Sequence, residues 1–220
     1  MFRREEVEKI LSQARRMDPL LKMFGVADHQ YRLASPVDLA FVRTIEEKYH
    51  FRFPEDYVQF ITEVGDGGAG PGYGLYSFGY YHTEVKSAKE AKVREAYLCG
   101  LGREIQLLPI EPEWLEDFCI SKKEYEKNPE KYFRGGRGSF NWDNDTPYGF
   151  FHLGTYGCGR DFGLITAGER CGQVFINDAE GSFELESDSF QAFYQDWLDF
   201  ILDTERFQKE LEEWRKIRNR

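Results

Sequence analysis

Apolar residues in the first 64 positions recur every three or four residues, which is the spacing of helices with one buried face. This pattern predicts one helix over Arg3–Arg16. A second is expected with Ser35 as N-cap and Pro36 at its first helical position. A third is expected to begin at Pro54, whose missing N–H is not needed there. Asp18–Ala34 lacks regular spacing and is expected to be irregular.

Beyond the third helix, aromatic and β-branched residues gather in short runs that are bounded by Gly, Asp or Pro. Such runs are typical of β-strands. The last four runs follow each other closely, which favours an antiparallel meander with tight turns. The predicted strands are Tyr73–Phe78, Ile105–Ile110, Tyr148–Leu153, Phe162–Thr166, Gln173–Asn177 and Ser182–Leu185.

The middle of the chain gives fewer signals. Ser87–Tyr97 and Pro112–Phe118 are expected to form short helices, and Gly135–Asp145 a surface loop. Residues 80–147 as a whole have no clear periodic organisation. No internal repeat and no linker-like composition divides the chain, so this segment is expected to belong to the same domain as its flanks.

The C-terminal residues 188–218 read as a long helix with a wide apolar stripe. Asp188 is the expected N-cap, and a change of phase in the stripe predicts a bend near Asp203–Thr204. Together these elements predict one α+β domain over residues 1–220. Its sheet is expected to be mixed but mostly antiparallel, and packed against the N-terminal helices and the long C-terminal helix.

Acidic residues are concentrated near the C-terminus. The net charge of the 220 residues is −10, and residues 169–213 hold thirteen acidic against three basic side chains, so this segment accounts for the whole net charge. Because phosphate binding depends on Lys and Arg, nucleic acid is disfavoured as the main partner. An acidic surface would instead attract and orient a basic protein. A solvated face without a partner is the simpler alternative, and both stay open.

The N-terminus is charged from its first residues and has no apolar core of a signal peptide. No apolar run approaches the roughly 20 residues that cross a bilayer. We therefore expect a cytoplasmic protein with no membrane partner. The four cysteines form no CxxC pair and the four histidines are scattered, so packed, reduced thiols are expected, and no metal or cofactor.

The glycine-rich stretch Gly65–Gly79 is the first candidate for chemistry. A Walker phosphate loop requires GxxxxGK[ST], and a dinucleotide loop joins a strand to a following helix. Here the glycines follow a predicted helix and precede a predicted strand, and no lysine follows the glycines until Lys86. The stretch is typical of a helix end and a turn.

Two further segments contain residue types used in catalysis or metal binding. Cys158 follows His152 by six residues, but nothing in the sequence brings the thiol to an imidazole or a helix dipole. Asn141–Asp145 is similar to the start of a calcium loop, without its glycine and terminal glutamate. No catalytic or metal-binding residue is assigned, and an enzyme that uses Cys158 or the glycine loop is the third of three hypotheses.

Several motifs resemble those of the SMI1/KNR4 family, part of the SUKH superfamily. Phe53-Pro54-Glu55-Asp56-Tyr57 with Phe60-Ile61 is similar to the "LP.dY..F" pattern, and Gly65-Asp66-Gly67-Gly68 stands where "NGG" is usual. Phe53 replaces the usual Leu, and Asp66 the usual Asn. Further similarity lies in Phe151–Ile165, Gly172-Gln-Val-Phe and Asp188–Leu198.

The resemblance covers about residues 36–79 and 148–202, roughly half of the chain. It leaves out the N-terminal helix and connector (1–34) and a divergent central insertion (80–147). The central insertion is a candidate for the recognition of a partner specific to this protein. The resemblance implies a single α+β domain. Bacterial members serve as immunity proteins that bind and block a cognate toxin, often a nuclease, eukaryotic relatives are scaffolds, and members are not known for catalysis.

Our first hypothesis is therefore a non-enzymatic immunity protein that binds a basic toxin domain. A nuclease must present a basic cleft, which an acidic surface can occupy. The second hypothesis is a scaffold or regulatory interaction module without a toxin. The sequence leaves the oligomeric state open. The residues proposed for partner binding are Asp178, Glu180, Glu184, Glu186 and Asp188 around the last predicted strand, with Asp143 and Asp145 as further candidates in a loop.

Overall fold

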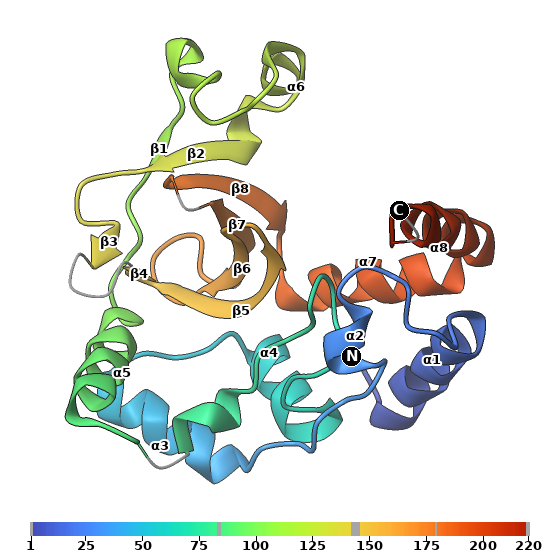
Figure 1. Ribbon diagram of the computed structural model, residues 1–220. Coiled ribbons are helices and arrows are strands. Elements are labelled where there is room, and N and C mark those ends of the chain that lie inside the picture. The colour runs from blue at the N-terminus through green and yellow to red at the C-terminus, as the bar shows by residue number, and fades with distance from the viewer. Residues whose placement is uncertain (1, 83–84, 142–145, 179, 219–220) are drawn as a thin grey trace.

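An antiparallel sheet of six strands forms the centre of the computed structural model (Figure 1). The structure describes residues 2–82, 85–141, 146–178 and 180–218. The strand order is β1-β2-β8-β7-β6-β5, and a short β3–β4 pair accompanies the sheet. The strands are β1 (Leu107–Pro109), β2 (Tyr132–Gly135), β3 (Phe140–Asn141), β4 (Thr146–Pro147), β5 (Phe150–Gly157), β6 (Arg160–Ile165), β7 (Val174–Asp178) and β8 (Ser182–Ser187).

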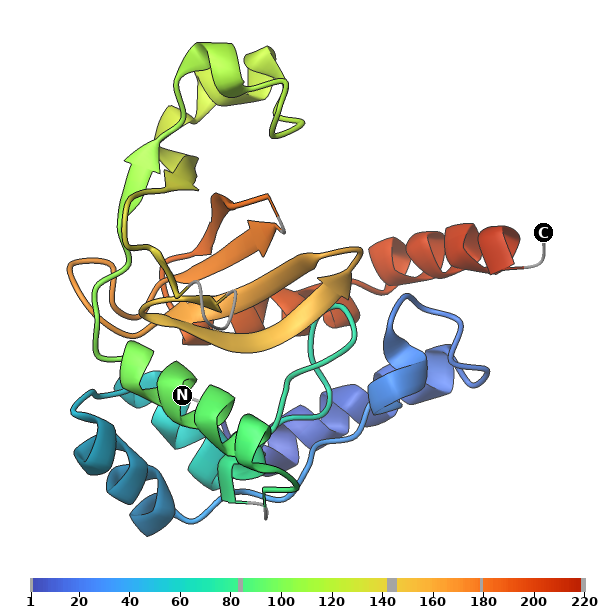
Figure 2. The ribbon, with the colours of Figure 1, turned by 60° about the vertical axis from the view of Figure 1, so that its left-hand side comes forward.

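Helices cover one face of this sheet and extend beyond its edges (Figures 1 and 2). Helix α7 runs along the sheet, and α8 continues outward from it at the end of the chain. The α-helices are α1 (Arg4–Met17), α2 (Val26–His29), α3 (Leu39–Tyr49), α4 (Glu55–Gln59), α5 (Ala88–Gly100), α6 (Lys122–Lys127), α7 (Phe190–Leu202) and α8 (Thr204–Arg218). Single turns are η1 (Phe60–Val64), η2 (Phe78–His82), η3 (Pro112–Trp114) and η4 (Pro129–Lys131).

The two faces of the sheet have separate apolar cores, because successive strand residues point in opposite directions. Phe151, Leu164 and Ile176 belong to the larger core, which includes residues of α1, α4 and α7. Phe150 and Phe175 belong to a smaller core on the other face. The expected α+β domain, with its antiparallel sheet and its N- and C-terminal helices, is confirmed.

Aromatic rings join α7 to the segment that carries the "LP.dY..F" similarity. The ring of Phe60 packs against Tyr194 with centroids 4.6 Å apart and against Phe190 at 5.1 Å. The Tyr194 hydroxyl donates a hydrogen bond of 3.0 Å to the carbonyl of Ala69 in the glycine-rich stretch. These motif residues therefore hold the last third of the fold to the first third.

The glycine-rich stretch is a structural loop built around Asp66. This buried carboxylate accepts hydrogen bonds from the Phe78 amide at 2.7 Å and the Ser77 hydroxyl at 2.7 Å. Gly68 has a φ of +92°, and a Cβ there would lie 2.4 Å from the carbonyl oxygen of Arg32, so the position requires glycine. The loop turns the chain back toward β5 rather than opening a helix N-terminus to a ligand.

Several predicted boundaries agree with the structure. Helix α1 and the strands β6 to β8 lie within two residues of their predicted ranges, and β1 lies inside the predicted Ile105–Ile110. β5 overlaps the predicted Tyr148–Leu153 but continues to Gly157. Ser87 caps α5 by accepting a hydrogen bond from the amide of Glu90. The chain also bends at Asp203, which separates α7 from α8 as the change of phase in the apolar stripe predicted.

Other local predictions are wrong, and two of them concern helix starts. The second helix begins at Leu39, and its N-cap is Asp38 rather than Ser35, because the Asp38 side chain accepts from the Ala40 amide. The N-cap of α7 is Ser189, whose hydroxyl accepts from the Ala192 amide, so Asp188 is left outside. In both cases a residue of another capping type lies within three positions of the predicted N-cap and takes its role.

Most of the remaining errors lie in or next to the central insertion. Tyr73–Phe78 is not a strand, since within this range only Leu75 forms β-bridges, and these are isolated. The amide of Phe78 donates a hydrogen bond to Asp66, and η2 begins at this residue. Pro112–Phe118 forms only the single turn η3. The expected loop Gly135–Asp145 contains β3, and its residues 142–145 lie outside the described part of the chain. β2, β4 and α6 were not predicted, and neither was α2, which lies in the stretch Asp18–Ala34 that was expected to be irregular.

Candidate partner-binding site

Strand β8 carries two of the predicted acidic residues on one face. Phe183 and Leu185 pack into the smaller core, so the alternation of the strand directs Glu184 and Glu186 to the opposite face. This is the face that α7 covers farther along the sheet. The two glutamates therefore lie on one face of β8, but their neighbours differ.

Glu184 is paired inside the structure. One carboxylate oxygen lies 2.7 Å from the Lys131 Nζ and the other 3.5 Å from the Arg160 Nη2. Lys131 directly precedes β2 and Arg160 begins β6, so the two bases reach Glu184 from separate strands. A carboxylate with two basic neighbours is a weak attractor for a basic partner, since its charge is already balanced.

Two acids at the ends of β8, Asp178 and Asp188, also accept hydrogen bonds within the protein. Asp178 closes the turn before β8, because its Oδ1 accepts from the amides of Glu180 at 3.0 Å and Ser182 at 2.9 Å. Asp188 accepts from the Gln173 side chain at 3.2 Å. Glu180 and Asp188 are exposed at opposite ends of the strand. Asp143 and Asp145 lie outside the described residues.

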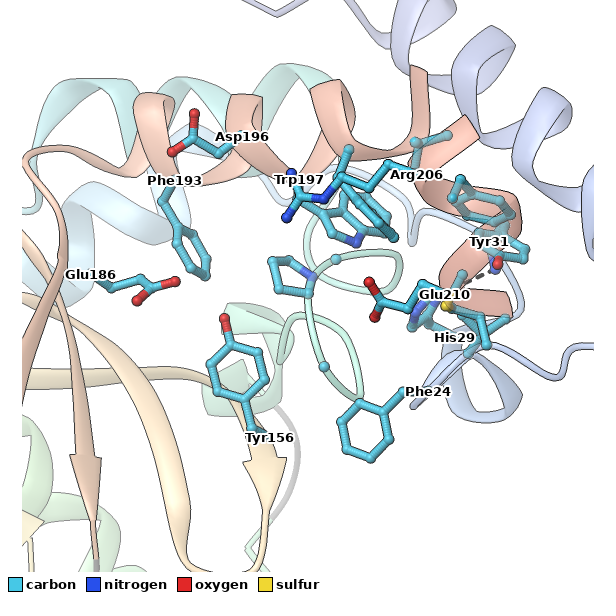
Figure 3. Close-up of a pocket in the computed structure, with 18 residues that line it drawn as sticks. Phe24, His29, Tyr31, Tyr156, Glu186, Phe193, Asp196, Trp197, Arg206 and Glu210 are labelled. Carbon is cyan, nitrogen blue, oxygen red and sulfur yellow. Dashed lines mark hydrogen bonds between the residues drawn. The ribbon is translucent and has the colours of Figure 1, made fainter. Parts of the chain in front are cut away.

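Glu186 lines a pocket of about 380 Å³ that the sequence did not predict (Figure 3). The pocket lies where β8, α7 and α8 meet the N-terminal segment around α2 and the loop at Pro71. Its volume is at the small end of the range of about 300–1,000 Å³ for ligand pockets. It brings together parts of the chain that are far apart in sequence.

Aromatic side chains form much of the pocket wall. Phe24 stacks on Trp214 of α8 with ring centroids 4.9 Å apart, which fixes the N-terminal segment against the last helix. Tyr156 packs against Phe162 at 4.9 Å, and its hydroxyl points up into the space near Glu186 (Figure 3). The wall therefore offers ring faces that suit a flat or cationic group.

Three carboxylates and one guanidinium stand around this wall. Glu186 comes from β8, Asp196 from α7, and Glu210 and Arg206 from α8. Within the described residues none of these four side chains has an ion-pair partner, and Arg206 instead lies over the ring of Phe200 at 5.2 Å. The pocket thus carries an excess of negative charge that the fold does not balance.

The surroundings also affect the ionisation of Glu186. Partial desolvation raises the pKa of this exposed carboxyl above its usual value, Lys131 opposes the change, and Glu184 adds to it. A cation placed beside Glu186 would reverse this effect. The charged form of Glu186 is therefore disfavoured in the folded protein, whereas Lys131 and Arg160 stabilise the charge of Glu184.

His29 is buried at the N-terminal side of the pocket. Its Nδ1 accepts a hydrogen bond of 3.1 Å from the Tyr31 amide, and burial lowers its pKa to about 4. The imidazole is neutral at pH 7, so the proton is on Nε2. This Nε2–H has no hydrogen-bond partner among the described residues, although the side chain is only 8% exposed.

Cys158 and His152, which the sequence offered as catalytic candidates, do not form a thiol–imidazole pair. Cys158 is exposed in the turn between β5 and β6, where its φ is +53°. The Nδ1 of His152 lies 3.6 Å from Asp161 rather than beside the thiol, and burial lowers its pKa. Within the described ranges no three His, Cys, Asp or Glu side chains group around a metal position. None of the helices described is both long and apolar enough to span a bilayer.

An antiparallel sheet with helices on one face, and an acidic aromatic pocket at its edge, defines this chain as an α+β domain with a candidate binding surface. The family model of SMI1/KNR4 (SUKH-1) matches residues 36–196, well over half of the chain. The chain therefore belongs to the SMI1/KNR4 family. No curated protein and no solved structure gives a significant match.

The family match divides the pocket in two. Glu186 and Asp196 lie inside residues 36–196, whereas His29, Arg206 and Glu210 lie outside them. The family region thus supplies β8 and most of α7, and the two ends of this chain supply the rest. Sequence reasoning counted Asp196 and Glu210 among the acids of the C-terminal segment, but no local signal placed them beside Glu186.

Proposed function

We propose that this protein is an immunity protein that binds and neutralises a cognate bacterial toxin in the cytoplasm, without catalysis of its own. Membership of the SMI1/KNR4 family supports a protein-interaction domain of this kind. The observation that carries the proposal is the set of unpaired carboxylates, Glu186, Asp196 and Glu210, around one pocket. An unbalanced acidic surface speeds association with a basic partner and favours it over others.

A nuclease domain is the toxin class that this surface fits best. Such an enzyme must bind a polyanion, so its cleft is lined by Lys and Arg. A protein that covers the cleft with carboxylates blocks the substrate by occupying its place. The exposed acids Glu180 and Asp188 extend the same negative charge along β8, and Glu184 contributes less because Lys131 and Arg160 balance it.

The test is coexpression of the full chain with the toxin encoded beside it, together with affinity measurement of the purified complex. The variant Glu186→Lys/Glu210→Lys is expected to lose protection and to weaken binding at least tenfold, mainly through slower association. The matched control is Glu5→Lys/Glu47→Lys, which changes the net charge equally on the exposed surfaces of α1 and α3. Equal loss in both variants, or in neither, would contradict this location of the binding surface.

A scaffold or regulatory module without a toxin is the second candidate. It draws support from a second pocket of about 540 Å³ beside α5, where the exposed side chains of Tyr76, Tyr80 and Val93 gather. This mainly apolar surface suits a protein partner that need not be basic. A gene neighbourhood with no modular secreted toxin, and a partner complex unaffected by Glu186→Lys/Glu210→Lys, would favour this function.

A further inference from the structure

The carboxylates of Glu186 and Glu210 enter the pocket from opposite sides. In Figure 3 the Glu186 side chain reaches in from β8 on one side and the Glu210 side chain from α8 on the other. Asp196 points away from this space toward the outer rim. The pocket therefore has two facing acceptor groups and one acid farther out.

No basic side chain among the described residues forms an ion pair with either carboxylate. Arg206 is close enough to line the pocket, but its guanidinium lies over Phe200 and makes no ion pair with described residues. Desolvation raises the pKa of Glu186, and the like charges of Glu184 and Asp196 add to this effect. A group with positive charge would oppose this effect and use both acceptors at once.

His29 gives an independent indication that the pocket receives a polar group. Its Nε2–H is a buried donor without an acceptor within the described residues, although the large majority of buried polar groups in proteins are paired. A lone cation cannot accept this hydrogen bond. A peptide can, because it brings a carbonyl oxygen together with its side chain.

We propose that the pocket binds an arginine of the partner protein, with the guanidinium between Glu186 and Glu210 and a carbonyl oxygen of the same segment at His29. Arginine fits better than lysine because its planar group pairs with carboxylates through several N–H donors and stacks on aromatic rings such as Tyr156. This inference rests on the proposed function, since it names the chemistry by which the partner is recognised.

Arg206 makes the proposal testable by the direction of an effect. If the guest is a cation, Arg206 repels it, and Arg206→Gln strengthens binding. If the guest is an anion, Arg206 is its binding residue, and the same substitution weakens binding. The substitutions Glu186→Gln and Glu210→Gln must act in the opposite direction to Arg206→Gln.

The probes are four capped tripeptides, acetyl-Gly-X-Gly-amide with X as Arg, Lys, Gln or Glu, titrated into the full chain. Binding is followed by the indole N–H signal of Trp197, which lines the pocket, in ¹H–¹⁵N spectra assigned with Trp197→Phe. The Arg peptide is expected to bind most tightly. Glu186→Gln and Glu210→Gln each weaken it about three- to tenfold, and Arg206→Gln tightens it about twofold or more. Glu47→Gln, on exposed α3, is the control that changes nothing.

The histidine nitrogens provide a second readout. The Nε2 signal of His29 in ¹⁵N spectra is expected to shift on binding of the Arg peptide. Preference for the Glu peptide, weaker binding by Arg206→Gln, or no shift of Trp197 with any peptide would overturn the inference. A toxin complex that forms but ignores Glu210→Gln and Arg206→Gln would overturn the arginine pocket alone. Failure of the chain to bind or block any toxin, with peptide binding intact, would overturn only the proposed function.

Discussion

Glu184 and Glu186 lie two residues apart on the same face of β8, yet the structure surrounds them in different ways. Lys131 and Arg160 hold Glu184 at 2.7 and 3.5 Å, whereas Glu186 faces a pocket with two further unpaired acids. One carboxylate joins strands of the sheet, and the other is left for a partner. The difference teaches that an acidic segment is a set of residues with separate roles, which only their neighbours decide.

The same division extends through the molecule. Glu46 is fully buried and accepts from the Phe53 amide at 2.8 Å, with the Arg43 guanidinium also at 2.8 Å. Asp66 is buried and holds the glycine-rich loop. These paired acids belong to the family region, whereas Glu210 belongs to α8, beyond the family match. The comparison predicts that paired acids affect stability and pocket acids affect binding.

The largest effect on stability is expected at Glu46. Glu46→Ala removes a buried carboxylate from two arginines and from the Phe53 amide, which should lower the free energy of unfolding by about 3–5 kcal/mol. Glu46→Gln retains one acceptor and should cost about 2 kcal/mol. Urea unfolding measures both. A loss below about 1 kcal/mol for Glu46→Ala would break the distinction between the paired and pocket acids.

The next effect is a pH dependence that His29 causes at the pocket. Burial lowers its pKa from 6.5 to about 4, so the unfolded chain binds the proton more tightly and stability falls as the pH falls from about 6.5 to 4. The loss should reach about 3 kcal/mol below pH 4. His29→Asn, which keeps an acceptor for the Tyr31 amide, should flatten this part of the profile. An unchanged slope would show that the histidine is not held neutral.

A smaller effect is expected at Glu184. Glu184→Gln should lower the free energy of unfolding by no more than about 1 kcal/mol, because its partners are partly exposed to solvent. The loss should shrink at high salt, which screens such pairs. A double-mutant cycle with Lys131→Gln measures the coupling. Zero coupling at low salt would mean that Glu184 is as available to a partner as Glu186.

The smallest effect on stability is expected at Glu186. Its pKa is raised in the folded state, so the folded chain holds the proton more tightly and stability falls as the pH rises above the usual glutamate value. Glu186→Gln should remove this small penalty and leave stability at pH 7 unchanged or higher by well under 1 kcal/mol. Thermal unfolding at several pH values measures it. A clear destabilisation would place Glu186 with the paired acids.

Predictions from the sequence succeeded where a local pattern matched a local structure. The 3.6-residue spacing gave α1, short runs of aromatic and β-branched residues gave β5 to β8, and the change of phase gave the bend at Asp203. They failed where two residues could do the same task, as with Ser189 and Asp188 at the start of α7. They failed again where a side chain distant in sequence binds a backbone amide that a strand would have used. The Phe78 amide donates to Asp66, and η2 begins there instead of a strand.

The sequence by itself determined the family, the α+β class and the acidic charge of the C-terminal segment, because periodicity, motif and composition are local properties. Only the tertiary structure decided which acid is paired. The pocket joins residue 29 to residues 186 and 210, and packing of the two chain ends against β8, rather than any spacing along the chain, brings those side chains together.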